Sequence, residues 1–132
     1  MRFLRYQKND EVRWGWLDGT RIGAVVGDVF GDYKREGPVA ELHEVTVLPP
    51  ASPGKIIAVG NNYANRLDEL GAAPPDIPTL FLKPPSAVIG HGEAIALPSQ
   101  SSEVEHEAEL AVVMGRRARW VSVEDALKFV WG

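Results

Sequence analysis

Residues 103–115 constrain the fold of this chain more than any other stretch, because their charges alternate with a period of two and an apolar run follows. In a β-strand, successive side chains point to opposite faces. The run from Leu110 to Met114 has the composition of a buried strand. We therefore predict one strand that enters the hydrophobic core. The glutamates that would share one of its faces are Glu103, Glu105, Glu107 and Glu109.

The glutamates nearest the buried run are candidate metal ligands. Like charges along one strand face repel one another, and carboxylates are rarely buried without a cation or a hydrogen-bond partner. In a strand, the Cα atoms of Glu107 and Glu109 would be about 6.6 Å apart. Their hard oxygen donors suit Mg²⁺, Mn²⁺ or Ca²⁺. The pattern alone favours an ordinary solvated strand face over a metal site. The rest of the chain must therefore decide between these two interpretations.

Composition limits the class of protein. A chain of 132 residues is long enough for one domain, or for one domain and a small appendage. Its formal net charge of −4 argues against nucleic acid or an anionic membrane as the main partner. Cysteine is absent, which excludes disulfides and thiolate chemistry. The sequence has neither a signal-peptide pattern nor an apolar run of about 20 residues, so we expect a cytoplasmic protein.

The first fifty residues predict a small antiparallel meander. Asn9-Asp10 predicts a turn and Asp18-Gly19 is a hairpin signal, whereas residues 31–38 are expected to form a loop. Residues 51–54, Ala-Ser-Pro-Gly, are typical of a linker. We therefore place a domain boundary there, with domains over residues 1–50 and 51–132. The segments with the composition of strands are residues 3–6, 12–17, 20–26 and 45–48.

Trp14 and Trp16 lie two positions apart in one of these strands, so their side chains would share a face. Two neighbouring indoles could stack on a ligand. Aromatic side chains on a short sheet are more often packed inside the protein. We therefore favour core packing for both tryptophans.

A strand, a turn and a helix are expected after the linker. Residues 55–59 are apolar and predict a short strand buried on both faces. A polar turn that contains Asn62 and Tyr63 leads into a helix over residues 64–70, with Gly71 just past its end. Loops that leave a buried strand and open a helix often carry functional groups. The turn is therefore a second candidate for a binding site.

Two further elements are expected towards the carboxyl terminus. Residues 79–82 predict an apolar strand that delivers Lys83 just before two prolines. A lysine at the end of a strand is usually solvated, so its position alone assigns it no role. Residues 122–125 form a helix-capping signature, and the apolar residues that follow share one stripe. A helix over residues 122–131 is the expected result.

Three motifs, taken in order, resemble the fumarylacetoacetate hydrolase family. The match in order and spacing extends from Lys55 to Gly132. The preceding segment is similar to the small amino-terminal domain of many bacterial members. Those members are often labelled 2-hydroxyhepta-2,4-diene-1,7-dioate isomerases. The resemblance implies an α+β, mainly β fold, in which the meander precedes the first part of a mixed β-roll. It also implies a homodimer. The motifs are KIIAVGNNY at 55–63, FLKPPSAVIG at 81–90 and HEAELAVVMG at 106–115.

The resemblance also implies roles for individual residues. Glu107 and Glu109 would ligate Mg²⁺ or Mn²⁺, which a 2-oxo or enol acid substrate chelates. Lys83 would place a positive charge where negative charge develops on the enolate oxygen. Glu69 matches a family acid that moves protons. The substrate-binding positions are Asn62, Tyr63 and Lys83.

Two features depart from the family pattern. The family's water-activating histidine, four residues after Asn62, is Arg66 here, and an arginine cannot act as a base at neutral pH. Arg66 is therefore a catalytic position whose change favours isomerisation or decarboxylation over hydrolysis of a carbon–carbon bond. The family's third metal ligand, an aspartate, would lie beyond Gly132. We therefore expect weak metal binding and no turnover from these 132 residues alone.

Two hypotheses about function follow. The leading one is a divalent-metal-dependent isomerase, decarboxylase or carbon–carbon hydrolase that acts on 2-oxo or enol diacids of aromatic catabolism. The alternative is a catalytically inactive fragment, or a degenerate family member that serves as a binding or dimerisation module. Arg66 is the best support for the alternative, because a cation there could hold an anionic ligand without any chemistry.

Overall fold

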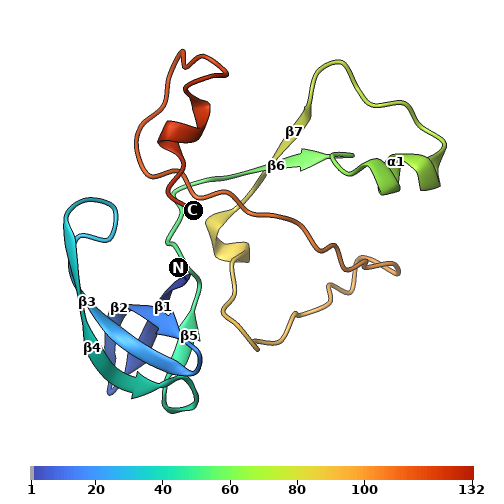
Figure 1. Ribbon diagram of the computed structural model, residues 1–132. Coiled ribbons are helices and arrows are strands. Elements are labelled where there is room, and N and C mark those ends of the chain that lie inside the picture. The colour runs from blue at the N-terminus through green and yellow to red at the C-terminus, as the bar shows by residue number, and fades with distance from the viewer. Residues whose placement is uncertain (1) are drawn as a thin grey trace. The chain divides into compact units, whose positions relative to one another are not determined.

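The computed structural model describes residues 2–132, and β-strands make up most of the regular structure. The chain divides into two compact units, of which one comprises Met1–Ala51 with Gly90–Gly132 and the other comprises Ser52–Ile89. Figure 1 shows the strands as two separate sheets. The predicted mainly β class is confirmed. The predicted division into domains 1–50 and 51–132 stays a prediction.

The amino-terminal sheet has five antiparallel strands in the order β4-β3-β2-β1-β5. Two-residue turns join the first three strands, as the sequence predicts. Asn9 and Asp10 in the first turn have φ of 51° and 62°, which is the backbone of a tight hairpin turn. Gly19 in the second turn also has a positive φ, of 60°. The strands are β1 Arg2–Lys8, β2 Glu11–Asp18, β3 Arg21–Gly27, β4 Tyr33–Glu41 and β5 Thr46–Leu48.

Strand β4 shows that the prediction of a loop over residues 31–38 is wrong. It pairs with β3 through two register shifts, on either side of Gly23, and Gly23 lies opposite Pro38. Edge strands and bulges are the places where a sheet tolerates proline, because a proline has no N–H to donate to the ladder. The glycine and proline that predict a loop are therefore accommodated in an irregular edge strand.

The hydrophobic core lies on one face of this sheet. Leu4 and Tyr6 are buried, and Ile22 is completely buried. Gly15 lies beneath them, since a Cβ there would come within 2.5 Å of Cγ2 of Ile22 and 3.0 Å of Cε1 of Tyr6. The space at Gly15 is thus already filled by the core. The partly buried residues packed against the core are Leu17, Ala40, Leu42, Val45 and Val47.

Gly15→Ala is expected to lower the free energy of unfolding by about 1–3 kcal/mol, which is the usual cost of overpacking a core. The new methyl would collide with Ile22 and would lie 3.0 Å from the carbonyl oxygen of Gly23. Gly37→Ala is the matched control, because no atom lies within 4 Å of a Cβ at that position. Urea unfolding followed by tryptophan fluorescence measures both variants. Equal stability of the two would contradict the assigned packing.

Trp14 and Trp16 lie on the face of the sheet opposite the core. Trp16 pairs with Gly23, and a Cβ at Gly23 would be 2.2 Å from the indole, so the ring occupies the space of the missing side chain. The Nε1 of Trp16 donates to the carbonyl oxygen of Glu36 at 3.0 Å. The ring of Trp14 packs edge-on against Phe30. Both tryptophans therefore pack against protein, although not within the main core that the sequence predicts for them.

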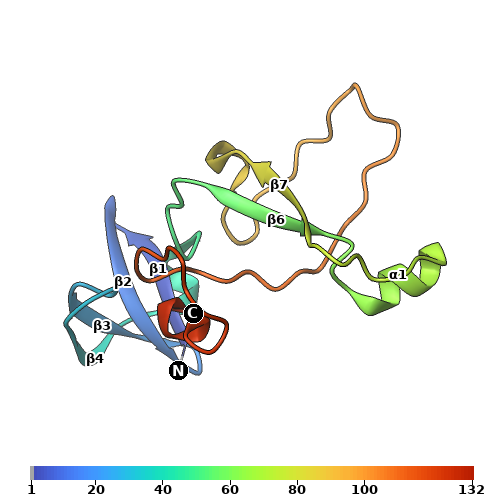
Figure 2. The same ribbon diagram turned by 90° about the horizontal axis from the view of Figure 1, so that it is seen from above.

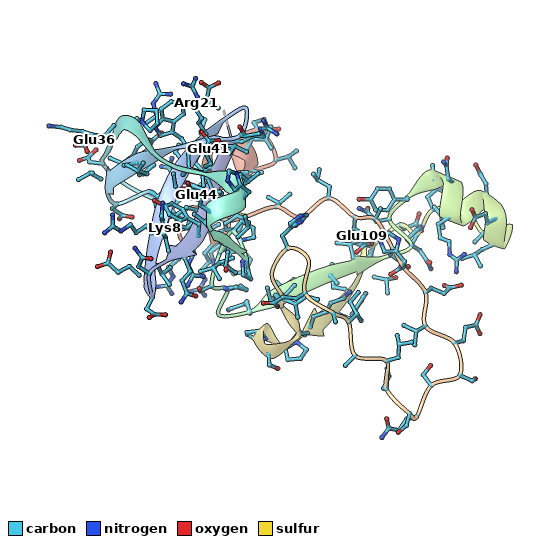
Figure 3. All side chains as sticks on the ribbon, turned by 90° about the horizontal axis from the view of Figure 1, so that it is seen from below. Lys8, Arg21, Glu36, Glu41, Glu44 and Glu109 are labelled. Carbon is cyan, nitrogen blue, oxygen red and sulfur yellow. The ribbon has the colours of Figure 1, made fainter. Side chains whose placement is uncertain are left out.

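An ion pair joins β1 to the short 3₁₀ turn η1 (Leu42–Glu44). Nζ of Lys8 lies 2.8 Å from Oε2 of Glu44, and both side chains are labelled in Figure 3. The hydrogen bond from Lys8, assisted by the backbone N–H of Glu41, lowers the pKa of Glu44. Because the folded-state pKa is depressed, the pair stabilises the fold at neutral pH, and this contribution is lost as the pH falls through that pKa.

The second unit holds a two-stranded antiparallel sheet and a helix. Strand β6 (Ile56–Gly60) pairs along its whole length with β7 (Thr79–Lys83), and helix α1 covers Ala64–Leu70. All three elements confirm the sequence prediction. Gly71 ends α1 with a φ of 60°, also as predicted. The expected burial of both faces of β6 is wrong, because Ile57 is 58% exposed. An apolar run specifies a strand but not the layer that would cover it.

The carboxyl-terminal part has little regular structure, contrary to the sequence prediction. Residues 103–113 form no strand, and Leu110, predicted to be buried, is 84% exposed. A strand needs a neighbour for its backbone N–H and C=O groups, and residues 2–132 provide no strand neighbour for this segment before an isolated bridge at Met114.

The predicted helix over residues 122–131 is also wrong. Only Ala126–Phe129 forms a helical turn, the 3₁₀ helix η3, and Val130 is drawn into the bridge with Met114. A further 3₁₀ turn, η2, covers Pro85–Ala87. In the part of the chain that the structure describes, no helix is long and apolar enough to cross a membrane.

Candidate active site

Glu107 and Glu109 lie in the same unit as the amino-terminal sheet, on a segment without helix or strand. Both side chains are exposed, and Glu109 is labelled in Figure 3. Their carboxylates are the donors that hard divalent cations prefer. Within residues 2–132, no three acidic, histidine or cysteine residues are grouped so that they could hold a metal ion. The two glutamates therefore fit a metal as part of a ligand set, not as a complete one.

Arg66 and Glu69 interact directly on helix α1. Nη1 of Arg66 donates to Oε2 of Glu69 at 3.1 Å, the contact expected for residues three apart on a helix. The side chains are 45% and 65% exposed, so the pair adds only a few tenths of a kcal/mol to stability. The sequence assigns these residues separate roles, and the structure brings them together. The hydrogen bond places the two side chains next to each other on one face of α1.

Asn62 and Tyr63 lie in the turn between β6 and α1. The backbone of Tyr63 is extended, and its carbonyl oxygen accepts hydrogen bonds from the N–H groups of Arg66, at 3.0 Å, and Leu67, at 3.2 Å. Leu67 is buried and fixes one side of the short helix. The side chains of Asn62 and Tyr63 are exposed. The turn therefore has a defined backbone and presents both side chains at the surface.

Lys83 lies at the opposite end of the two-stranded sheet from this turn. It pairs with Ile56, whereas Gly60, which precedes the turn, pairs with Thr79. Four residues of antiparallel strand separate these ends by about 14 Å. Nζ of Lys83 lies 5.8 Å from the ring centroid of Phe81, within the range of a cation–π interaction. The structure thus does not bring Lys83 together with Asn62 and Tyr63, and the roles of all three stay predictions.

The amino-terminal sheet has a surface feature that sequence reasoning missed. The guanidinium of Arg35 lies 5.6 Å from the ring centroid of Trp16. This stacked pair borders an open hollow on β2 and β4. No sequence signal could have revealed it, because its residues on β4 fall in the segment predicted to be a loop. The hollow is lined by Trp16, Lys34, Arg35, Glu36 and Gly37.

Comparison with known proteins gives one family for most of the chain. Residues 55–132 match the family model of the fumarylacetoacetate (FAA) hydrolase C-terminal domain, and residues 1–50 match the N-terminal domain of Rv2993c-like proteins. Protein Rv2993c of Mycobacterium tuberculosis is 39% identical over an alignment of 139 residues, and this alignment covers all of this chain and 52% of that protein. The mitochondrial oxaloacetate tautomerase FAHD2A of Bos taurus is 42% identical over 96 residues, which cover 72% of this chain and 31% of that protein.

A solved structure extends the match over nearly the whole chain. The 5-carboxymethyl-2-hydroxymuconate delta-isomerase of Mycobacterium smegmatis has a TM-score of 0.82 and 36% sequence identity. The match covers 98% of this chain and 51% of that one. The chain thus spans about half the length, or less, of the relatives that it matches. Because the family model covers more than half of the sequence, the chain belongs to the fumarylacetoacetate hydrolase family.

Proposed function

We propose that the intact protein is an isomerase that interconverts the enol and oxo forms of a 2-oxo diacid, and that it acts as a homodimer. The observation that carries this proposal is the similarity to a muconate delta-isomerase and an oxaloacetate tautomerase, two relatives whose names both describe isomerisation. The substrates in those names carry two or three carboxylates, one of them beside a hydroxyl or oxo group. The same class of substrate is proposed for this protein.

Arg66 supports isomerisation over hydrolysis. Hydrolysis of a carbon–carbon bond needs a base that activates water. A guanidinium keeps its proton at neutral pH and cannot serve as that base. In the structure, Arg66 donates a hydrogen bond to Glu69 instead. Decarboxylation needs no activated water either, so the assay must follow both kinds of product.

Glu107 and Glu109 are proposed as two of the ligands of Mg²⁺ or Mn²⁺. Their exposure leaves both carboxylates accessible, and their donor chemistry suits either ion. A divalent cation bound there would act as a Lewis acid that stabilises negative charge on a substrate oxygen. The remaining ligands are proposed to come from groups other than residues 2–132, because the described residues contain no complete set.

The other candidate residues have roles that need no contact with the cation. Glu69 is proposed to exchange a proton with the substrate, and the guanidinium of Arg66 lies beside its carboxylate at 3.1 Å. Lys83 is proposed to stabilise the enolate oxygen by its positive charge. Asn62 and Tyr63 are proposed to bind the substrate through the surface of their turn.

Lys83→Met in the intact protein is expected to lower kcat about 10²–10³-fold, the usual loss when one oxyanion-stabilising group is removed. Lys83→Arg keeps the charge but changes its shape, so it should recover part of this loss. Lys128→Met is the control, because that lysine is 70% exposed and pairs with Asp125 outside the candidate site. Steady-state kinetics of the three variants measures the effect. Wild-type kcat in Lys83→Met would remove Lys83 from the mechanism.

The proposed function is tested by incubating the intact protein with oxaloacetate or a 2-hydroxymuconate and following the enol absorbance. We expect conversion with Mg²⁺ or Mn²⁺, none after treatment with a chelator, and recovery when the metal is restored. Released carbon dioxide would redirect the assignment to a decarboxylase, and cleavage fragments would redirect it to a hydrolase. Absence of any conversion in the metal-loaded protein would favour a binding or dimerisation module.

A further inference from the structure

Trp131 packs on the face of the amino-terminal sheet that carries Trp14. Its ring centroid lies 5.7 Å from that of Phe3, 5.5 Å from that of Trp14 and 5.0 Å from that of Phe30. These three side chains are termed the aromatic socket. The indole Nε1 donates to the carbonyl oxygen of Val29 at 2.8 Å, and Val29 is itself buried. An indole with aromatic neighbours and a satisfied N–H has the properties of an anchor.

The anchored residue holds a second piece of backbone beside it. The N–H of Trp131 donates to the carbonyl oxygen of Val113 at 2.8 Å. In return, the N–H of Val113 donates to the carbonyl oxygen of Gly132 at 2.7 Å. The N–H of Gly115 donates to the carbonyl oxygen of Phe129 at 2.8 Å. A Cβ at Gly115 would lie only 2.9 Å from Cβ of Trp131. Residues 113–115 are therefore fastened to the socket through Trp131.

Three large apolar side chains of the carboxyl-terminal segment are far more exposed than the half-buried Trp131. Trp120 is 89% exposed, Val123 is 87% exposed and Leu127 is 82% exposed. Figures 1 and 2 both show the carboxyl-terminal end of the chain close to the start of β1, the strand that carries Phe3. Trp131 thus attaches the segment to the sheet, whereas the side chains of Trp120, Val123 and Leu127 are exposed to solvent.

We propose that Trp131 is a positioning residue, and that the amino-terminal sheet serves as its receptor. The aromatic socket takes the indole and thereby fixes the backbone at Val113–Gly115. This inference goes beyond the proposed function, because it requires neither a metal nor a reaction. Glu109 precedes Val113 by four residues, a distance of at most about 14 Å in an extended chain. Fixing Val113 therefore limits how far Glu109 can move from the sheet.

Hydrogen exchange followed by mass spectrometry on the whole chain tests this inference. Trp131→Ala is expected to raise exchange at the amides of Val113 and Gly115 about tenfold or more, while peptides from β1 to β3 keep their protection. Trp131→Phe keeps the ring contacts and loses the bond to Val29, so it should restore part of the protection. Trp120→Ala is the matched control, because it removes an exposed indole from the same segment and should change nothing.

Two results would overturn the inference. Unchanged exchange at Val113 and Gly115 in Trp131→Ala would show that the socket does not fix them. Loss of protection throughout β1 to β3 would show that Trp131 is simply a core residue of the sheet. Neither result depends on the isomerase assay, so a failure of the proposed function and a failure of this inference are distinguishable.

Discussion

Ile22→Ala is expected to lower the free energy of unfolding of the amino-terminal sheet by about 2–5 kcal/mol, the range for truncating a buried isoleucine. Ile22 has no exposed surface, and among the described residues it shares its cluster with two other buried side chains, Leu4 and Tyr6. A small domain has a total stability of about 5–15 kcal/mol. A core with so few members has few other contacts to compensate for the cavity. Urea unfolding monitored by tryptophan fluorescence gives the loss directly.

Val26→Ala is the control for this prediction. Val26 lies on the same strand, β3, but is 51% exposed. Its truncation should cost less than about 1 kcal/mol, the span of strand propensities at partly exposed positions. Equal losses for the two variants would mean that strand propensity, and not the buried cluster around Ile22, determines the stability of the sheet.

The elements that could be predicted from the sequence are those with a local cause. Asn9-Asp10 forms one tight turn and Gly19-Thr20, which follows Asp18, forms the other, and the three consecutive strands pair in the register that these turns set. Gly71 ends α1 because its backbone adopts a positive φ without a Cβ penalty. Such signals act within a few residues, so they hold whatever the rest of the chain does.

The elements that the sequence mispredicts depend on distant partners. Strand β4 forms because it pairs with β3 through an irregular register that accommodates Pro38. This pairing outweighs the loop-like composition of the segment that forms β4. The alternating pattern of residues 103–113 predicts which residues would share a strand face. It does not determine whether a neighbouring strand is present to pair with them. Trp131 bonds to a carbonyl oxygen 102 residues away in the sequence. No helical stripe could have predicted that contact.

The candidate site shows the same division between local and distant information. The pair of Arg66 and Glu69 follows from a spacing of three on a helix, so the sequence could have predicted it. The separation of Lys83 from Asn62 follows from the register of β6 and β7, which no motif encodes. Motif order therefore identifies which residues to test, and the strand register determines which of them can act side by side.

Replacing both Glu107 and Glu109 with glutamine in the intact protein is expected to lower metal-dependent turnover about 10³-fold or more, because the cation supplies several kcal/mol of stabilisation to a developing negative charge. Glutamine keeps the size of each side chain and removes its charge. Calorimetric titration with Mn²⁺ provides a second measurement, and we expect the binding heat to disappear.

The acidic segment provides its own control, the double variant Glu103→Gln with Glu105→Gln. All four glutamates are exposed on the same segment without helix or strand, so neither double variant should disturb the fold. If the charge of the segment merely attracted cations, the two variants would lose Mn²⁺ binding equally. If Glu107 and Glu109 are ligands, only their replacement removes both binding and turnover. Full activity in the Glu107 and Glu109 variant would refute their assignment to the metal site.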